Sequence, residues 1–352
     1  MSRLKDIIAT QIAQDGPMSL ASYMALCLLH PEHGYYATRD PFGRAGDFTT
    51  APEISQMFGE LLGLAMVQSW LDQGAPDGPL LCELGPGRGS LMRDMLRASS
   101  KVPGFAPQVH LVEASPTLRG IQRETLEGHD VVWHDTLDTL PEAPLFLVAN
   151  EFFDALPIRQ FLRAGQGWSE RRVTLQEGAL GFGLTEPAPV AALAHRLADT
   201  KPGDIVEICP AAAPVMAGIS ERIGRHGGAA IVVDYGGWRS LGDTFQAMQG
   251  HAFVDPFADP GAADLTAHVD FEALAQAVAR PCVATAMTPQ GVLLERLGIT
   301  ERAQRLARGL SGNALESHIA AHRRLTHPEE MGSLFKTIAI HREPSPPPPG
   351  FD

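Results

Sequence analysis

The chain has 352 residues, of which 44% are hydrophobic and 20% are charged, and its formal net charge is −13. This length corresponds to about two average domains or to one large α/β unit with insertions. The acidic balance argues against a nucleic-acid-binding protein and against a polybasic membrane-surface protein, because both depend on a basic face. The four cysteines form no C-x-x-C pair, so we expect buried, reduced thiols.

The N-terminal segment shows no export or membrane signal. It has no secretory apolar core and no stretch of about 18 apolar residues. Residues 1–13 have apolar side chains at helical spacing, but Arg3 and Lys5 are too few for an organelle presequence, and Asp6 is unfavourable in one. The sequence therefore predicts a soluble, cytoplasmic protein without a membrane partner.

The first 75 residues are predicted to be helical, apart from one glycine-rich loop at 30–50. Ser19 stands where it can cap a helix that ends at Leu29. Residues 50–53 have the spacing of a capping box, and the apolar stripe that follows, 54–65, predicts one amphipathic helix. We therefore expect an N-terminal helical segment with a lid loop.

From residue 80 onward, short apolar runs alternate with helical stretches, which predicts a parallel sheet with crossover helices. The predicted strands are 80–82, 109–112, 131–133, 145–149, 229–233, 283–287 and 334–341. This unit, 76–342, is interrupted by insertions at about 160–225 and 236–270, the first of which contains β-hairpins. The proline-rich tail 343–352 is predicted to be extended, with little core to offer.

The sharpest chemical signal is a glycine-rich turn between a predicted strand and a predicted helix. Glycines allow the backbone to approach a ligand closely. A dinucleotide site would have its third glycine at Ser90, and Glu83 would repel a pyrophosphate, so a cationic or zwitterionic ligand fits better. The pattern resembles motif I of class I S-adenosylmethionine-dependent methyltransferases. A turn without a ligand and a nicotinamide or flavin site are the alternatives. The candidate cofactor contacts are Glu83, Gly85, Pro86, Gly87 and Gly89.

Polar side chains also follow the next strands. Glu113 ends the second strand, where a carboxylate can accept both ribose hydroxyls. Asp135 follows the third strand, either as an adenine contact or as a helix N-cap, and Asn150 ends the fourth. Asp47 and Thr49 belong to the loop that we expect over the methionyl end of the cofactor, although a purely structural loop fits their sequence equally well.

Candidate catalytic residues follow the fourth and fifth strands. In doubly wound sheets, ligands bind beyond the carboxyl ends of the strands. Glu151 and Asp154 can form a fork for a guanidinium group, and the alternative is a surface turn above packed phenylalanines. Asp234 and Tyr235 close the fifth strand and are expected to point into the same cleft.

Eight segments, in chain order, resemble the MidA-like family. They are 33–36, 46–60, 83–89, 150–157, 234–236, 264–271, 288–299 and 331–340. The resemblance implies a class I S-adenosylmethionine-dependent methyltransferase fold, which is Rossmann-like with a seven-stranded, mostly parallel sheet. It also implies S-adenosyl-L-methionine as cofactor and a protein substrate. Because the family includes a mitochondrial complex I assembly factor regarded as a protein arginine methyltransferase, it implies an arginine-bearing complex I subunit.

The sequence departs from the usual arginine methyltransferases in three respects. Glu151 and Asp154 are a loose counterpart of their double-glutamate loop, the Thr-His-Trp tripeptide is absent, and no all-β C-terminal half is evident. We expect a protein arginine N-methyltransferase with no metal site. The alternatives are a cofactor-binding assembly chaperone for a basic client and an NAD-dependent oxidoreductase. The sequence does not set the oligomeric state.

Overall fold

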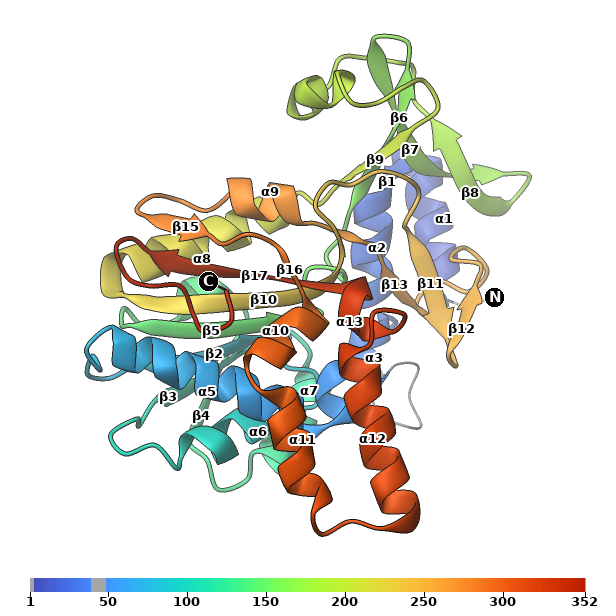
Figure 1. Cartoon of the computed structure of the whole chain (residues 1–352). Coiled ribbons are helices and arrows are strands. Elements are labelled where there is room, and N and C mark those ends of the chain that lie inside the picture. Colours follow the sequence, from blue (N-terminus) through green and yellow to red (C-terminus); the bar gives the residue numbers. More distant parts are fainter. Residues whose placement is uncertain (1–2, 39–48, 352) are drawn as a thin grey trace.

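The computed structural model of the chain describes residues 3–38 and 49–351, and its centre is a large β-sheet (Figure 1). Seven strands lie in the order β15-β17-β10-β5-β2-β3-β4, and the short strands β14 (Val269–Asp270) and β16 (Thr288–Pro289) extend this sheet. The seven are β2 (Leu80–Leu84), β3 (Gln108–Val112), β4 (Val131–His134), β5 (Leu145–Asn150), β10 (Gly228–Gly237), β15 (Cys282–Ala284) and β17 (Phe335–Arg342).

The strand directions confirm the predicted class I methyltransferase fold. Strands β2, β3, β4, β5 and β10 are mutually parallel, whereas β17 runs antiparallel to both of its neighbours, β10 and β15. The strand order reverses between β2 and β5, because the chain moves outward from β2 to β4 and then returns to β5 on the other side of β2. Such a switch point opens a crevice at the carboxyl ends of the strands, where ligands bind.

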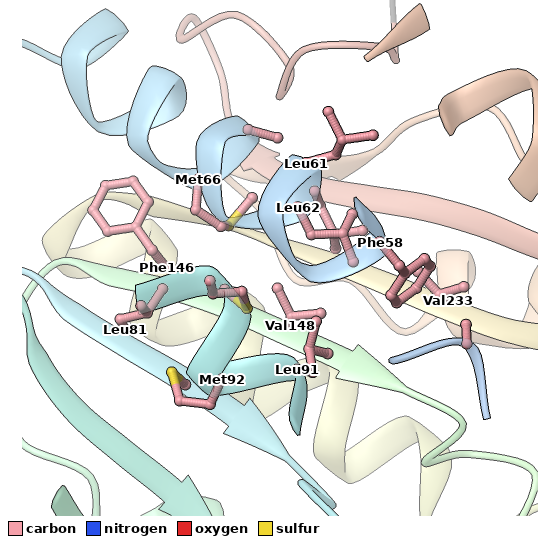
Figure 2. Packing of buried hydrophobic residues seen from close by; sticks show 14 of the residues in the cluster. Phe58, Leu61, Leu62, Met66, Leu81, Leu91, Met92, Phe146, Val148 and Val233 are labelled. Carbon is pink, nitrogen blue, oxygen red and sulfur yellow. The ribbon is translucent and has the colours of Figure 1, made fainter. Parts of the chain in front are cut away.

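Two helices, α5 (Gln56–Asp72) and α6 (Ser90–Ser99), cover one face of this sheet. Figure 2 shows Phe58, Leu62 and Met66 of α5 against side chains of α6 and of the strands. The helix predicted over 54–65 is confirmed as α5, but its start is wrong: α4 (Ala51–Ile54) stops at Ser55, whose side chain caps α5 by accepting from the Met57 N–H. The Thr50 side chain makes no capping hydrogen bond, so the predicted capping box is wrong.

The opposite face is covered by α8 (Ala212–His226) and α9 (Phe271–Gln276). Met216, Ile219 and Ile223 of α8 are fully buried in the core beneath this face. Helix α8 therefore forms the crossover into β10, and the boundary of the first insertion, expected near 225, lies too late. Asp270 caps α9 by accepting from the Ala273 N–H.

A second lobe is built from three separate parts of the chain and projects at the upper right of Figure 1. Its elements are α1 (Arg3–Asp15), β1 (Met18–Ser19), α2 (Leu20–Leu29), β6 (Arg159–Ala164), β7 (Gly167–Gln176), β8 (Ala179–Leu184), β9 (Ile205–Ile208), β11 (Gln246–Gln249), β12 (Ala252–Val254) and β13 (Asp264–Thr266). Ile8, Tyr23, Val173 and Leu265 share one buried cluster. The predicted hairpins are confirmed, but α1 and α2 belong to this lobe, so residues 1–75 do not form one helical unit.

The helices α10 (Gln290–Arg296), α11 (Ile299–Ala307) and α12 (Gly312–Thr326) lie between β16 and β17 in the sequence. A buried carboxylate ties α11 to α5 and α6: Glu60 accepts from Arg302 (2.7 Å) and Arg97 (3.1 Å). Burial alone would raise the pKa of Glu60, but these two guanidinium groups lower it.

The C-terminal tail returns to this helical layer. Phe351 is buried in the core, and Arg296 donates to the Gly350 carbonyl at 2.8 Å, so the tail contributes to the core, contrary to prediction. None of the helices in the described residues has the length and apolar character needed to cross a membrane.

We predict opposite effects for alanine at two helical glycines. A Cβ at Gly63 would lie 2.7 Å from the Met95 Cα, so Gly63→Ala would force α5 away from α6 and cost about 1–3 kcal/mol of unfolding free energy. Gly120 of α7 (Pro116–Thr125) has no atom within 4 Å of such a Cβ, so Gly120→Ala should stabilise the protein by about 0.5–1 kcal/mol. Urea denaturation measures both values. Equal stability of the two variants would contradict this packing.

Candidate cofactor and active site

The glycine-rich turn after β2 forms the floor of the crevice at the switch point. Gly85, Gly87 and Gly89 have positive φ angles of 59°, 53° and 82°, which favour glycine. A Cβ at Gly85 would lie 3.0 Å from the Phe152 ring, so the glycine also permits a close approach between two loops. The buried Pro86 accepts from the Gly89 N–H at 2.8 Å, which closes the turn. The sequence prediction of a tight turn into α6 is confirmed.

An apolar cavity of about 320 Å³ opens beside this turn. Its walls come from the ends of β2, β3 and β5 and from the second lobe, and they include Val112, Leu137, Phe152 and Leu28. Pockets of this size and apolar character bind small molecules, with a few polar groups fixing the orientation. Glu113, Asp135 and Glu151 supply polar groups at the margin, which suits a heterocycle that carries a polar sugar.

A smaller space of about 40 Å³ continues from this cavity along the turn and shares Gly85, Gly87 and Glu151 with it. Glu83 and Asn150 line it, both buried. In the described part of the chain, Glu83 Oε2 and Asn150 Oδ1 lack hydrogen-bond partners. Buried acceptors without partners are costly, so these two atoms indicate a ligand with donor groups. Burial raises the pKa of Glu83 to about 8.

Glu113 lies at the rim of the larger cavity, as the sequence predicts. Its Oε1 accepts from the Ser115 N–H at 2.8 Å, and its Oε2 accepts from Gln122 Nε2 at 3.1 Å. Burial raises the pKa of Glu113, and these hydrogen bonds oppose that rise. Each carboxylate oxygen keeps a second acceptor site, so the bidentate contact with ribose stays compatible with the structure.

The remaining predicted cofactor residues are less enclosed. Asp135 borders the larger cavity, but its exposed carboxylate pairs with Arg119 at 2.6 Å. It caps no helix, because Thr136 occupies the N-cap position. Asp47 lies outside the described residues. Thr49 is partly buried but is not among the residues that line either space, although its neighbour Thr50 lines the smaller one.

Glu151 faces both spaces, as expected of a residue near the reacting atoms. Its φ angle of 52° is unusual for a residue with a side chain, and such strain is often found at functional sites. Its Oε1 accepts from Asn150 Nδ2 (3.1 Å) and the Ala51 N–H (3.3 Å). Burial raises the pKa of Glu151 to about 7.

Asp154 lies behind Glu151 and borders neither of the two spaces. It is buried, and its Oδ1 has no partner among the described residues. Burial and the nearby Glu151 charge raise the pKa of Asp154 to about 7, and a hydrogen bond to the Tyr235 side chain opposes the rise. The predicted pair of carboxylates is therefore brought together, but only Glu151 borders the cleft.

Asp234 does not point into the cleft, so the predicted substrate contact is wrong. Its side chain is fully buried, its Oδ2 accepts from the N–H groups of Phe153 (2.9 Å) and Asp154 (3.3 Å), and its Oδ1 accepts from Tyr235 (2.9 Å). The residue holds the 152–154 loop in place, because a carboxylate satisfies several backbone donors at once.

The Tyr235 side chain was also expected to point into the cleft, but it lines neither of the two spaces. Its ring packs edge-on against Phe335 and His268, and its hydroxyl accepts from Gln246 at 3.3 Å.

Sequence reasoning missed two contributors to the cleft. Tyr36 of α3 (Tyr35–Thr38) lines the larger cavity, and its carbonyl accepts from the Ser115 hydroxyl at 2.6 Å, which attaches the second lobe to the cleft. The Gly34-Tyr35-Tyr36 segment stands out in the sequence and is the available signal. Gln122, fully buried in α7, contacts Glu113 and Gly87, and no sequence pattern marks it.

Known proteins resemble this chain over almost its full length. Residues 61–289 match the model of an S-adenosyl-L-methionine-dependent methyltransferase family. The chain belongs to the MidA-like family of S-adenosyl-L-methionine-dependent methyltransferases. It is 35% identical to the protein arginine methyltransferase NDUFAF7 of Danio rerio over 95% of this chain and 85% of that protein. The human protein of the same name is 34% identical, over 94% of this chain and 81% of that protein.

A solved structure agrees with this family. The crystal structure of a Burkholderia thailandensis protein bound to S-adenosyl-homocysteine is 30% identical to this chain, with a TM-score of 0.84 over 99% of this chain and 92% of that one. S-adenosyl-L-methionine is therefore the cofactor of this methyltransferase. The cleft fits it, because the apolar cavity suits the nucleoside and the unpartnered acceptors of the smaller space suit the amino group.

The same comparisons correct two expectations. The nicotinamide alternative is wrong, because the family is one of methyltransferases. The predicted cytoplasmic location is contradicted, because the zebrafish and human relatives are both named as mitochondrial proteins. That prediction relied on the absence of a targeting signal, and such an absence is not evidence of a compartment.

We predict that binding of S-adenosylhomocysteine releases a proton from Glu83. A carboxyl with a pKa of about 8 is mostly protonated at pH 7, and the ligand's ammonium group favours its ionised form. The affinity should therefore rise between pH 6.5 and pH 8. Titration calorimetry in buffers of different ionisation enthalpy measures the released proton. Glu83→Gln should abolish the release, and an unchanged release in that variant would contradict the assignment.

Proposed function

We propose that this methyltransferase transfers the methyl group to an arginine side chain of a protein, and that the protein is a complex I type subunit. The observation that carries the arginine proposal is the pair of buried carboxylates, Glu151 and Asp154, beside the donor cleft. The zebrafish and human relatives are named protein arginine methyltransferases, which supports the same acceptor. The complex I subunit is proposed from the family resemblance alone.

The charges around the cleft favour a cationic acceptor. The Glu151 charge raises the pKa of Asp154, both of these charges raise the pKa of Asp234, and Arg324 of α12 is the cation that lowers the pKa of Glu151. Burial of several carboxylates with so little opposite charge is unfavourable. A guanidinium group presents donors in a planar fork and keeps its charge, so one that is bound at Glu151 offsets the carboxylate charge there, including that of Asp154 behind it.

The donor side of the cleft orients the cofactor. S-adenosyl-L-methionine, when bound, supplies a methyl group made electrophilic by its sulfonium. We assign the amino group to Glu83 and Asn150, the ribose hydroxyls to Glu113, and the adenine to the apolar wall that includes Leu137 and Phe152. Gly85 and Gly87 keep the backbone clear of side chains in this region, whereas Gly89 lines neither space.

The acceptor side aligns the guanidinium nitrogen and receives its proton. As the nitrogen forms its bond to the methyl carbon, the carbon–sulfur bond breaks and the nitrogen loses one proton. Glu151 is placed to accept that proton, because it borders both spaces and its pKa of about 7 suits a general base. Asp154 supplies the second carboxylate, and Asp234 holds the loop that carries both.

We predict that Glu151→Gln keeps cofactor binding and loses methyl transfer by about a hundredfold or more, because general bases contribute about 10²–10⁴-fold. Incubation with labelled cofactor and a complex I enriched fraction, followed by mass spectrometry, identifies the methylated residue. Glu207→Gln is the matched control, because Glu207 is also buried with a raised pKa but lies outside the donor cleft.

Three outcomes would refute this proposal. Full turnover by the Glu151→Gln variant would show that Glu151 is not the general base. Methylation of a residue other than arginine would show that the proposed acceptor is wrong. If the wild type binds a basic client without adding mass to it, the chain acts as an assembly chaperone instead.

We also predict that kcat/KM rises with pH through about 7. Raised pKa values mean that the Glu151 and Asp154 carboxyls are protonated below this pH and cannot align or deprotonate the guanidinium. The two groups titrate as a pair, so the apparent pKa values from the pH profile belong to the pair and not to either residue. Initial rates between pH 5.5 and pH 8.5 measure this dependence. A rate independent of pH in this range would contradict it.

A further inference from the structure

Gln122 joins three parts of the donor site from the middle of α7. Its Nε2 donates to the Gly87 carbonyl at 2.8 Å and to Glu113 Oε2 at 3.1 Å, and its Oε1 accepts from Trp133 Nε1 at 2.8 Å. The side chain is fully buried. It therefore connects the glycine turn after β2, the acid after β3 and the indole of β4, three elements that meet only in the folded protein.

The chemistry of the partners fixes the orientation of the Gln122 amide. An indole nitrogen only donates, whereas a carbonyl and an ionised carboxylate only accept. If the amide turned over, its NH₂ group would face the Trp133 N–H, and its oxygen would face two acceptors. The observed orientation satisfies both amide hydrogens and the amide oxygen, so the side chain has one stable position.

This fixed amide holds the Glu113 carboxylate from one side. On the other side, Oε1 of Glu113 accepts from the Ser115 N–H at 2.8 Å. The protein therefore fixes the positions of both Glu113 carboxylate oxygens before a ligand binds. The free lone pairs of these oxygens then point in one fixed direction. Hydrogen bonds to a carboxylate that is already in place cost less conformational entropy on binding.

We propose that Gln122 is a positioning residue that makes the donor site selective for the two ribose hydroxyls of the cofactor. It acts through Glu113 and the Gly87 peptide rather than by touching the ligand. The inference rests on the donor site proposed above, in which Glu113 binds the ribose, and it is independent of the arginine acceptor.

A buried glutamine can also serve stability alone, and the chain offers a matched case. Gln160 of β6 is equally buried, and its Nε2 donates to Glu207 (2.7 Å) and Asp243 (2.7 Å) while its Oε1 accepts from Arg171 (2.9 Å). It lies in the second lobe and does not line the donor cleft. A comparison of the two sites separates positioning from general stability.

The experiment measures calorimetric affinities for S-adenosylhomocysteine and its 2′,3′-dideoxy analogue in the wild type, Gln122→Leu and Gln160→Leu. Gln122→Leu should weaken S-adenosylhomocysteine binding by about tenfold or more, because Glu113 Oε2 and the Gly87 carbonyl lose the donor that Gln122 supplies. The affinity for the analogue should fall much less, so the ratio of the affinity for S-adenosylhomocysteine to that for the analogue should fall towards one. Gln160→Leu should keep both affinities within about twofold, even if its melting temperature falls.

A second variant keeps the test informative if Gln122→Leu does not fold. Trp133→Phe retains most of the ring and removes the donor that fixes the Gln122 oxygen, so the hydroxyl preference should fall by about threefold. If a folded Gln122→Leu or Trp133→Phe variant kept the wild-type preference for the ligand with ribose hydroxyls, the role of Gln122 would be overturned, and the Glu113 assignment would stand. If the wild type itself shows no preference between the two ligands, the Glu113 assignment fails, and the role of Gln122 fails with it.

Discussion

The burial of carboxylates at the switch point of the sheet is the constraint on which the rest of the structure depends. Glu83 at the end of β2 and Glu151 after β5 lie on either side of the strand reversal, with few donors to satisfy them. Their pKa values are raised above the unfolded values, so the folded protein loses stability as these groups ionise between about pH 4.5 and pH 8. The dense packing of α5 and α6 on the sheet compensates for this loss of stability.

Both lobes of the molecule contribute residues to the same cleft. The sheet supplies the glycine turn and the acids, whereas Leu28 of the second lobe and Tyr36 of the adjoining α3 line the larger cavity. The hydrogen bond from the Ser115 hydroxyl to the Tyr36 carbonyl joins the lobes beside the proposed ribose site. Binding of the nucleoside and attachment of the lobes therefore depend on the same turn before α7.

The sequence predicted those parts of the site that follow an apolar run directly. Glu83, Glu113 and Glu151 each end or follow a strand, and parallel strands bring such residues to one edge. The prediction failed where the position of a residue depends on the direction of its side chain or on contacts between distant segments. Asp234 follows the predicted strand 229–233 in the same way, but it lies within β10, and its side chain turns inward to the amides of Phe153 and Asp154. Gln122 and Tyr36 contribute to the site through contacts between distant segments, and only Tyr36 has a signal in the sequence, the Gly34-Tyr35-Tyr36 segment.

The most direct test of the account is a crystal structure of the chain with S-adenosylhomocysteine. The account predicts the amino group against Glu83 and Asn150, the ribose hydroxyls against Glu113, and the sulfur directed towards Glu151. A sulfur atom directed away from Glu151, towards α7 or the solvent, would contradict the claim that the buried carboxylates receive the acceptor beside the donor.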